Sequence, residues 1–392
     1  MYKLTEIEGG VCAANGFYAD GVSAGLKADM AKDMAFIYSE KKCEIASIFT
    51  TNKMAAAPIR HCKAKGEFQT NFVLINSKNA NAMTGNAGVE DINEILATLP
   101  ANIENPVMSS TGVIGVRIPK DKIIAGAKLF DLTKKDADAA AQAIMTTDTF
   151  SKQIAYKIEL EDGSSFHIGA MAKGAGMINP AMATMLCFIT TDANIAKEEM
   201  QAALNKNVQT TFNAASVDGD TSTNDTVLLL SNAKSGAYHA EAFEKALHKI
   251  MLFLAREMVR DGEGATKLVT YNVSGAKSDA EAEIVAKALS NSLLVKTALY
   301  GQDPNWGRIA STVGASGAYA VEEKLTISFN DICVYKKGEL FFDEAMEKKA
   351  SKVMQLNTFT ISCDLGIAEG KFTSFGCDLG YEYVKINADY RT

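Results

Sequence analysis

Residues 172–191 read AKGAGMINPAMATMLCFITT and combine two segments of opposite character. Its first half is rich in glycine and runs into Pro180, so the backbone can bend sharply there. From Thr184 onward the run TMLCFITT is apolar, which predicts a buried strand. Thr184 therefore stands where a Gly-rich approach meets a rigid strand, with the small Ala183 before it.

A threonine at a strand start needs no chemical explanation, because β-branched residues favour strands. The composition around Thr184 supports a second interpretation. Its hydroxyl could attack the carbonyl of Ala183 and form an ester, which water would then cut. The freed α-amine has a reference pKa of about 7.7–8.0 and can act as the general base for the hydroxyl of the same residue. This chemistry needs no histidine, and the chain has only four.

The composition excludes several other classes of protein. A chain of 392 residues that is 47% hydrophobic can bury a large core, and its length predicts two or three domains. The net charge of -7 and the absence of a Lys/Arg-rich cluster argue against a partner that is a nucleic acid or an anionic membrane. The sequence predicts neither a signal peptide nor a membrane span, so we expect a cytoplasmic protein.

The cysteines and acidic residues predict no metal site. The seven cysteines are widely spaced and include no C-x-x-C pair, which indicates reduced thiols packed as small hydrophobes. The segment DGDTSTNDT at 218–226 lacks the glycine and glutamate that a calcium loop needs at its sixth and twelfth positions. We expect this cluster to order a turn near the site through side-chain hydrogen bonds.

Strand and helix patterns alternate along the chain and predict a mixed α/β protein. The helix at 240–260 is the clearest, with an apolar stripe and Gly262 to end it. Surface helices are expected at 134–144 and 196–207, and another helix at 278–299. Strands are expected at 34–40, 44–51, 71–77, 153–160, 226–232, 268–275 and 324–330, and at the C-terminus in YEYVKINA (381–388).

The segment KGAGMINPAMATML (173–186) resembles the self-cleavage motif of the ornithine acetyltransferase family. These arginine-biosynthesis enzymes move an acetyl group from N-acetylornithine to glutamate, and some also use acetyl-CoA. Further family-like stretches follow in order along the whole chain: SSTGVIG (109–115), IMTTDT (144–149), DGDTSTNDT (218–226), REMVRDGEGATK (256–267), GQDPNWGRI (301–309) and YVKINADYRT (383–392).

The resemblance implies a layered sandwich of mixed β-sheets flanked by helices, of the self-processing type with an N-terminal threonine nucleophile. It implies a cut between Ala183 and Thr184 that gives an α fragment (1–183) and a β fragment (184–392), assembled as α2β2. We place the catalytic domain at 1–275 and a smaller C-terminal α+β domain at 276–392.

The resemblance also assigns roles to residues. Thr184 is implied to be the nucleophile, which carries the acetyl group as an ester in a ping-pong reaction, and Thr111 and Gly112 are implied to form the oxyanion hole. Lys173 could bind a substrate carboxylate or bias the oxyanion. The remaining substrate contacts implied by the resemblance are Thr147, Glu263, Asn387 and Thr392, together with Thr184.

Three functions remain open on these residues. The first is glutamate N-acetylation from N-acetylornithine, without a cofactor and with acetyl-CoA as a candidate second donor. The second is a self-processing aminopeptidase or amidase, in which water takes the acyl group. The third is a non-catalytic relative that binds amino acids and never cleaves. Transfer of the acyl group to glutamate indicates the first function, and its transfer to water indicates the second. A purified chain with the mass of the uncut protein indicates the third.

Overall fold

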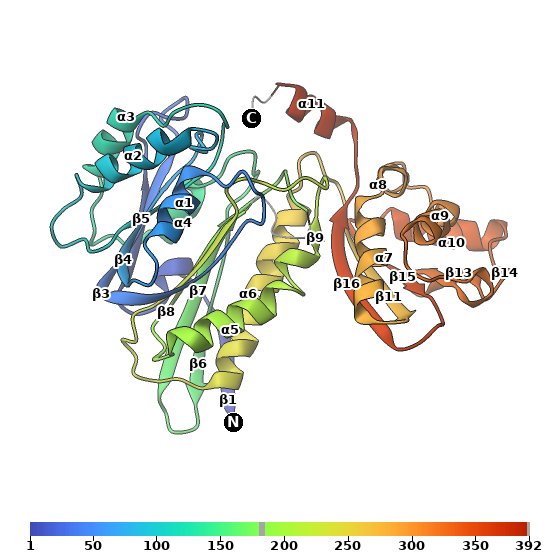
Figure 1. Cartoon of the computed structure of the whole chain (residues 1–392). Coiled ribbons are helices and arrows are strands. Elements are labelled where there is room, and N and C mark those ends of the chain that lie inside the picture. Colours follow the sequence, from blue (N-terminus) through green and yellow to red (C-terminus); the bar gives the residue numbers. More distant parts are fainter. Residues whose placement is uncertain (180–184, 390–392) are drawn as a thin grey trace.

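Two mixed β-sheets organise the chain, and helices cover both of them (Figure 1). The computed structural model describes residues 1–179 and 185–389. The predicted layers of mixed sheets flanked by helices are thereby confirmed. Among the described residues, no helix has the length and apolar character needed to cross a bilayer.

The larger sheet has nine strands among the described residues, and β8 and β10 are parallel neighbours at its centre. The strand β2 pairs with β3, beside the main path. In spatial order the path runs β1 (Tyr2–Ile7), β6 (Lys152–Leu160), β7 (Ser165–Lys173), β8 (Leu186–Thr191), β10 (Thr226–Ser231), β3 (Met34–Phe49), β4 (Thr70–Asn76) and β5 (Val107–Ser110), with β2 at Phe17–Val22.

The strand predictions at 34–40 and 44–51 correspond to one long strand, β3. Its first part pairs with β2 and β4, and its last part pairs with β10. The polar residues between the two parts are exposed, although the backbone stays extended. A run of exposed charges therefore resembles a loop in the sequence, while in the structure it marks where the strand exchanges partners.

Both faces of β8 are buried, which explains the unbroken apolar run after residue 184. On β8, Cys187 and Ile189 face a core formed with α5 (Lys197–Val208) and α6 (Ala240–Arg260). Leu186 and Phe188 face the opposite core, formed with α4 (Ala137–Ala143) and the short helix η1 (Gly10–Cys12). A strand covered on both faces is apolar throughout instead of alternating.

The helix α4 corrects the expectation of a surface helix at 134–144. Five of its seven residues are buried alanines. Alanine has the smallest side chain with a Cβ, so the helix can approach the sheet closely. Three further helices, α1 (Ala57–Ala64), α2 (Gly85–Leu96) and α3 (Lys120–Ala127), pack beside β4 and β5 around a separate core.

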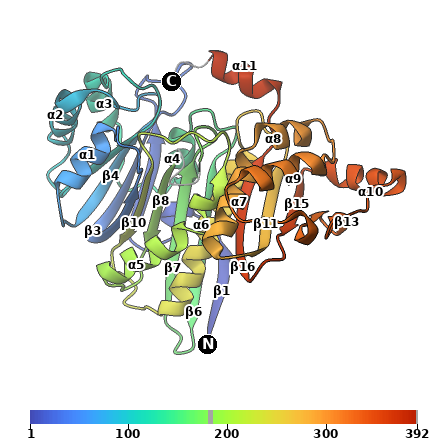
Figure 2. The same cartoon turned by 45° about the vertical axis from the view of Figure 1, so that its right-hand side comes forward.

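The helix α6 has the bounds that the apolar stripe predicted, and it lies between the two sheets (Figure 2). One core holds its stripe together with strands of the larger sheet and with Leu268 and Phe375 of the second sheet. The side chain of His239 accepts a hydrogen bond from the backbone N–H of Ala242 and caps the first turn.

We expect Leu254→Ala, in the middle of α6, to lower the free energy of unfolding by about 2–5 kcal/mol. Leu254 is fully buried in the core between the sheets, so truncation leaves a cavity. Its neighbour Phe253 is 38% exposed, and Phe253→Ala should cost no more than about 1 kcal/mol. Denaturant titration of both variants checks this, and equal losses would contradict the assignment of α6 as the central packing element.

The second sheet lies on the far side of α6, and among the described residues it has seven strands. In spatial order they are β14 (Glu339–Leu340), β13 (Ile332–Lys336), β12 (Thr326–Phe329), β15 (Thr358–Asp364), β11 (Leu268–Ala276), β16 (Gly370–Cys377) and β9 (Ala215–Ser216). The domain division at residue 276 stays a prediction, and β11, which ends there, belongs to this second sheet.

Four helices accompany the second sheet: α7 (Asp279–Asn291), α8 (Leu293–Tyr300), α9 (Trp306–Ala315) and α10 (Glu344–Met354). The single helix expected at 278–299 is in fact α7 followed by α8. Ser292 interrupts it with an extended backbone, and its hydroxyl accepts from the N–H of Val295 to cap α8. Trp306 stacks on Tyr335 within this part of the chain.

The strand expected at 381–388 is wrong, because this segment forms the helix α11 (Tyr381–Asp389). None of the described residues of α11 is buried, so no sheet core holds the segment in an extended form. Lys385 pairs with Glu382 across one helical turn, with a nitrogen–oxygen distance of 3.4 Å. The helix nevertheless contacts the rest of the chain, because Tyr383 and Asn387 make hydrogen bonds to Asp218 and Glu263.

All seven cysteines are free thiols, and six of them are buried as small apolar side chains. Burial raises the pKa of Cys12 to about 12 and that of Cys62 to about 11. The described residues contain no group of three or more His, Cys, Asp or Glu side chains arranged to hold a metal ion.

Candidate active site

A cavity of about 360 Å³ lies where several chain segments from distant parts of the sequence meet. The segments are the ends of β5 and β7, the loop after α4, the loop after β9, the loop after α6, and α11. Six of the residues predicted from the sequence line this cavity: Thr111, Gly112, Thr147, Lys173, Glu263 and Asn387. The structure thus brings together residues that are up to 276 positions apart (387 − 111).

The predicted nucleophile Thr184, its neighbour Ala183 and the predicted contact Thr392 lie outside the described residues. The chain on the N-terminal side of that region borders the cavity through Gly176 and Met177. On the other side the chain continues at Met185, which leads directly into β8.

Thr111 and Gly112 directly follow β5 in a loop that buried amides hold in place. The carbonyl of Asn76 accepts from the N–H of Thr111 at 3.0 Å, and the side chain of Asn224 donates to the carbonyl of Ser110 at 2.8 Å. Gly112 has φ +133°, and a Cβ there would lie 2.2 Å from the carbonyl carbon of Lys78. Only glycine fits this position.

Two hydrogen-bond donors of this loop remain available to a ligand. Within the described part of the chain, neither the N–H of Gly112 nor the hydroxyl of Thr111 has a hydrogen-bond acceptor. Both residues line the cavity. Fixed donors of this kind suit a negative charge that develops on an oxygen during a reaction.

Lys173 is the last residue of β7, and it is only 3% exposed. Lys173 is therefore not a solvated surface lysine. Its Nζ donates to the hydroxyl of Thr146 at 3.2 Å. Burial lowers the pKa of the Lys173 ammonium, and the nearby carboxylates of Asp148, Asp225 and Glu263 oppose that shift. A buried ammonium at a cavity wall is suited to bind a carboxylate.

Glu263 follows the end of α6, and its carboxylate lies against Gly176. A Cβ at position 176 would approach the carboxyl carbon of Glu263 to 2.5 Å, so the glycine makes room for this side chain. Oε2 of Glu263 accepts from the side-chain amide of Asn387 at 2.7 Å. The backbone N–H of Glu263 donates to the carbonyl of Ala175 at 2.8 Å, which ties the two loops together.

Asp218 and Tyr383 also line the cavity, although the sequence did not single them out as contacts. Asp218 accepts from the N–H groups of Met177 and Ile178 at 2.7 and 3.0 Å. The hydroxyl of Tyr383 donates to the same carboxylate at 3.3 Å, and burial raises the pKa of both groups. The expectation that 218–226 orders a turn near the site is confirmed, and its acidic residues were the signal for Asp218.

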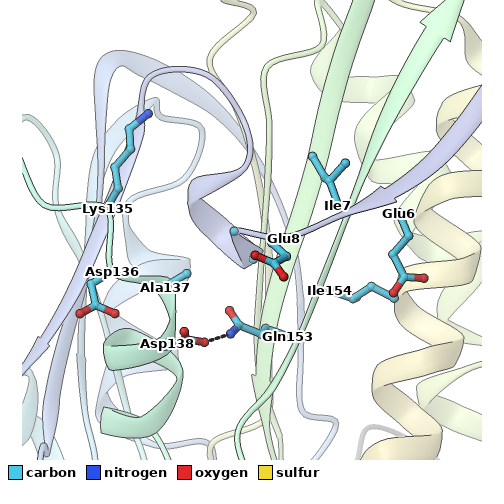
Figure 3. Close-up of a pocket in the computed structure, with 11 residues that line it drawn as sticks. Glu6, Ile7, Glu8, Lys135, Asp136, Ala137, Asp138, Gln153 and Ile154 are labelled. Atoms are coloured by element: carbon cyan, nitrogen blue, oxygen red, sulfur yellow. Dashed lines mark hydrogen bonds between the residues drawn. The ribbon is translucent and has the colours of Figure 1, made fainter.

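A second cavity, of about 660 Å³, lies at the start of α4 and holds none of the predicted site residues (Figure 3). Its wall carries four carboxylates, and the protein already uses three of them. Asp136 caps α4 by accepting from the N–H of Ala139, and Glu6 accepts from the hydroxyl of Tyr156 at 3.2 Å. Asp138 accepts from the side-chain amide of Gln153 (Figure 3). Chemistry rather than size therefore identifies the first cavity as the candidate active site.

Comparisons with known proteins agree with the motifs. A sequence model of the ArgJ family matches residues 18–392. The arginine biosynthesis bifunctional protein ArgJ of Wolinella succinogenes is 60% identical over 396 residues, which cover 100% of both chains. A similar protein of Caldanaerobacter subterraneus is 42% identical over 98% of this chain and 99% of its own.

Among solved structures, an arginine biosynthesis bifunctional protein argJ from Bacillus halodurans is 41% identical. It covers 51% of this chain and 97% of its own, with a TM-score of 0.49. The matched family model and the full-length relative are sufficient for an assignment. The chain belongs to the ArgJ family, whose relatives reported above are arginine biosynthesis bifunctional proteins.

Proposed function

We propose that this protein is a glutamate N-acetyltransferase that moves acetyl from N2-acetyl-L-ornithine to L-glutamate in arginine biosynthesis. One observation carries the proposal beyond family membership. A single cavity collects the Thr111–Gly112 donors, the buried Lys173 and the carboxylate of Glu263, and it borders the chain that leads to Thr184. The proposal includes self-cleavage between Ala183 and Thr184.

After the cut, Thr184 is the first residue of the β fragment and supplies both the nucleophile and the general base. The α-amine of Thr184 takes the proton from the hydroxyl of the same residue, and the oxygen attacks the acetyl carbonyl carbon. The N–H of Gly112 and the hydroxyl of Thr111 stabilise the resulting oxyanion. The bond from the acetyl carbon to the ornithine nitrogen breaks, ornithine leaves with the proton, and the acetyl group remains as an ester on Thr184.

Glutamate completes the cycle. Its neutral amine attacks the ester carbonyl, the same donors stabilise the second oxyanion, and the bond to the Thr184 oxygen breaks. The α-amine of Thr184 takes the proton that the attacking nitrogen loses and returns it to the threonine oxygen, and N-acetylglutamate leaves. One amide is exchanged for another, so the net reaction is close to balanced and needs no cofactor.

The charges around the cavity fit amino-acid substrates. Ornithine and glutamate each carry an α-carboxylate, which the Lys173 ammonium complements. Ornithine also has ammonium groups, which the Glu263 carboxylate complements. The bifunctional character of the family relatives supports acetyl-CoA as a second acetyl donor to glutamate. We also propose that the two fragments assemble as α2β2.

The acetyl-acceptor assay tests the function. Purified protein is incubated with N-acetylornithine, with and without glutamate, and acetate and N-acetylglutamate are quantified. We expect N-acetylglutamate to form with glutamate present, and little free acetate in either case. Acetate released at the same rate in both, without N-acetylglutamate, would instead identify a hydrolase.

Replacing Glu263 with glutamine should raise the KM for N-acetylornithine by roughly 10- to 100-fold, because a charge-assisted hydrogen bond is worth about 1.5–3 kcal/mol. Glutamine keeps the shape and the contact with Asn387 but loses the charge. Glu382→Gln on α11 is the matched control, since Glu382 is exposed and pairs with Lys385 instead. Equal KM values for the two variants, measured from initial rates, would remove Glu263 from the substrate site.

A further inference from the structure

A buried lysine behind the cavity forms an ion-pair network that the reaction steps above do not use. Lys152, the first residue of β6, is 1% exposed. Its Nζ lies 2.8 Å from Oδ1 of Asp148 and 2.5 Å from Oδ2 of Asp261. The two carboxylates are 0% and 2% exposed, so all three charges are withdrawn from water. None of the three residues lines the cavity.

Asp148 connects the network to the loop that carries Thr147. Its Oδ2 accepts from the N–H of Thr146 at 3.0 Å, so its bonds hold the backbone on one side of Thr147. Its Oδ1 accepts from the N–H of Gly174 at 2.7 Å, next to Lys173. One carboxylate thereby fixes two segments that supply cavity residues.

Asp261 connects the same network to Glu263. It is the C-terminal cap of α6 and lies two residues before Glu263. Its oxygens accept from the N–H of Thr149, at 3.0 and 3.1 Å, and from the hydroxyl of that residue. The loop after α4 and the end of α6 are therefore joined through Lys152 and its two carboxylates.

The charges of the network also act on Lys173. Burial opposes ionisation of Asp148, but the ammonium groups of Lys152 and Lys173 outweigh it and lower the pKa of that carboxyl. With Lys152 present, Asp148 has two ammonium groups beside it, and Lys152 repels Lys173. Without Lys152, Asp148 has only Lys173 to compensate its buried charge, so the Lys173 ammonium is drawn toward Asp148 and away from the cavity.

We infer that Lys152 is a positioning residue of the active site: it pairs with both Asp148 and Asp261, and so holds Thr147, Lys173 and Glu263 in the geometry that binds the amino-acid substrate. The inference deepens the proposed function and rests on it. It predicts that loss of Lys152 weakens substrate binding even at temperatures where the variant is fully folded.

Three variants test it. In Lys152→Met the charge is lost, and we expect the KM for N-acetylornithine and the Kd for ornithine to rise by roughly 10- to 100-fold, since small misplacements of positioning residues have effects of this order. In Lys152→Arg the charge is kept, and both constants should return to within about 10-fold of the wild type. Ile158→Ala, a fully buried position on the same strand, is the control for a destabilised β6.

All measurements are made below the unfolding temperature of each variant, determined by circular dichroism, with initial rates for KM and calorimetry for Kd. An unchanged KM and Kd in Lys152→Met would overturn the inference, and so would the same rise in Ile158→Ala. Should Lys152→Met not fold, Asp261→Asn takes its place. Asparagine at position 261 can keep the hydrogen bonds to Thr149. It removes one of the two negative charges that pair with Lys152, so the Kd for ornithine must rise at least about 3-fold.

The two readouts separate this inference from the proposed function. If the wild type transfers no acetyl group, the proposed function fails. Ornithine binding by the same variants still decides whether Lys152 positions the site. If the wild type is active and Lys152→Met binds as the wild type does, the inference alone fails.

Discussion

Thr184→Ala is expected to leave the chain uncut at its full 42.0 kDa and to reduce acetyl transfer by roughly 10⁴-fold or more. Alanine has no hydroxyl, so it can neither open the bond after Ala183 nor carry the acetyl ester. Intact-mass spectrometry of the purified proteins should show two fragments, of 183 and 209 residues (392 − 183), for the wild type only.

Thr184→Ser is the matched control, because it retains an oxygen nucleophile. It should still cleave and should keep measurable transferase activity. An alanine variant that splits at the same bond would show that the hydroxyl does not cut the chain. An alanine variant with full activity would show that Thr184 does not carry the acetyl group.

The second large effect concerns the oxyanion hole. Thr111→Val keeps the shape of the side chain and removes its hydroxyl donor, which has no acceptor within the described part of the chain. We expect kcat to fall by roughly 10²–10³-fold with little change in KM, because the donor acts on charge that develops only in the transition state.

Thr98→Val serves as the control for this prediction. The hydroxyl of Thr98 donates to the carbonyl of Ile95 near the end of α2, and it does not line the cavity. Steady-state kinetics on N-acetylornithine should leave this variant near the wild-type kcat. If Thr111→Val raises KM and leaves kcat unchanged, its hydroxyl binds the substrate ground state instead.

Local patterns in the sequence predicted the elements that are periodic or uniformly apolar. The stripe of α6 and the apolar run of β8 left little choice, because burial of a helix stripe and of both strand faces requires such residues. Local patterns gave wrong predictions where the tertiary structure decides which residues are buried. The alanines of α4 are buried although the segment looks like a surface helix, and α11 is helical although YEYVKINA looks like a strand.

The site could be predicted residue by residue only through the family resemblance. No local rule shows that Thr111, Lys173 and Glu263 share one cavity, since long-range packing of the two sheets around α6 determines it. Lys152 is the residue that the sequence was least able to identify. In the sequence it is one lysine among many, and only the structure shows that it is buried between the carboxylates of Asp148 and Asp261.

Detection of the acetyl-enzyme shows whether Thr184 carries the acetyl group. The wild type is mixed with N-acetylornithine without glutamate, quenched in acid, digested and sequenced by mass spectrometry. We predict one acetyl group on the hydroxyl of Thr184, at the first position of the second fragment, and its disappearance when glutamate is added before the quench. An active enzyme that carries no acetyl group, or carries it on another residue, would contradict the proposed mechanism.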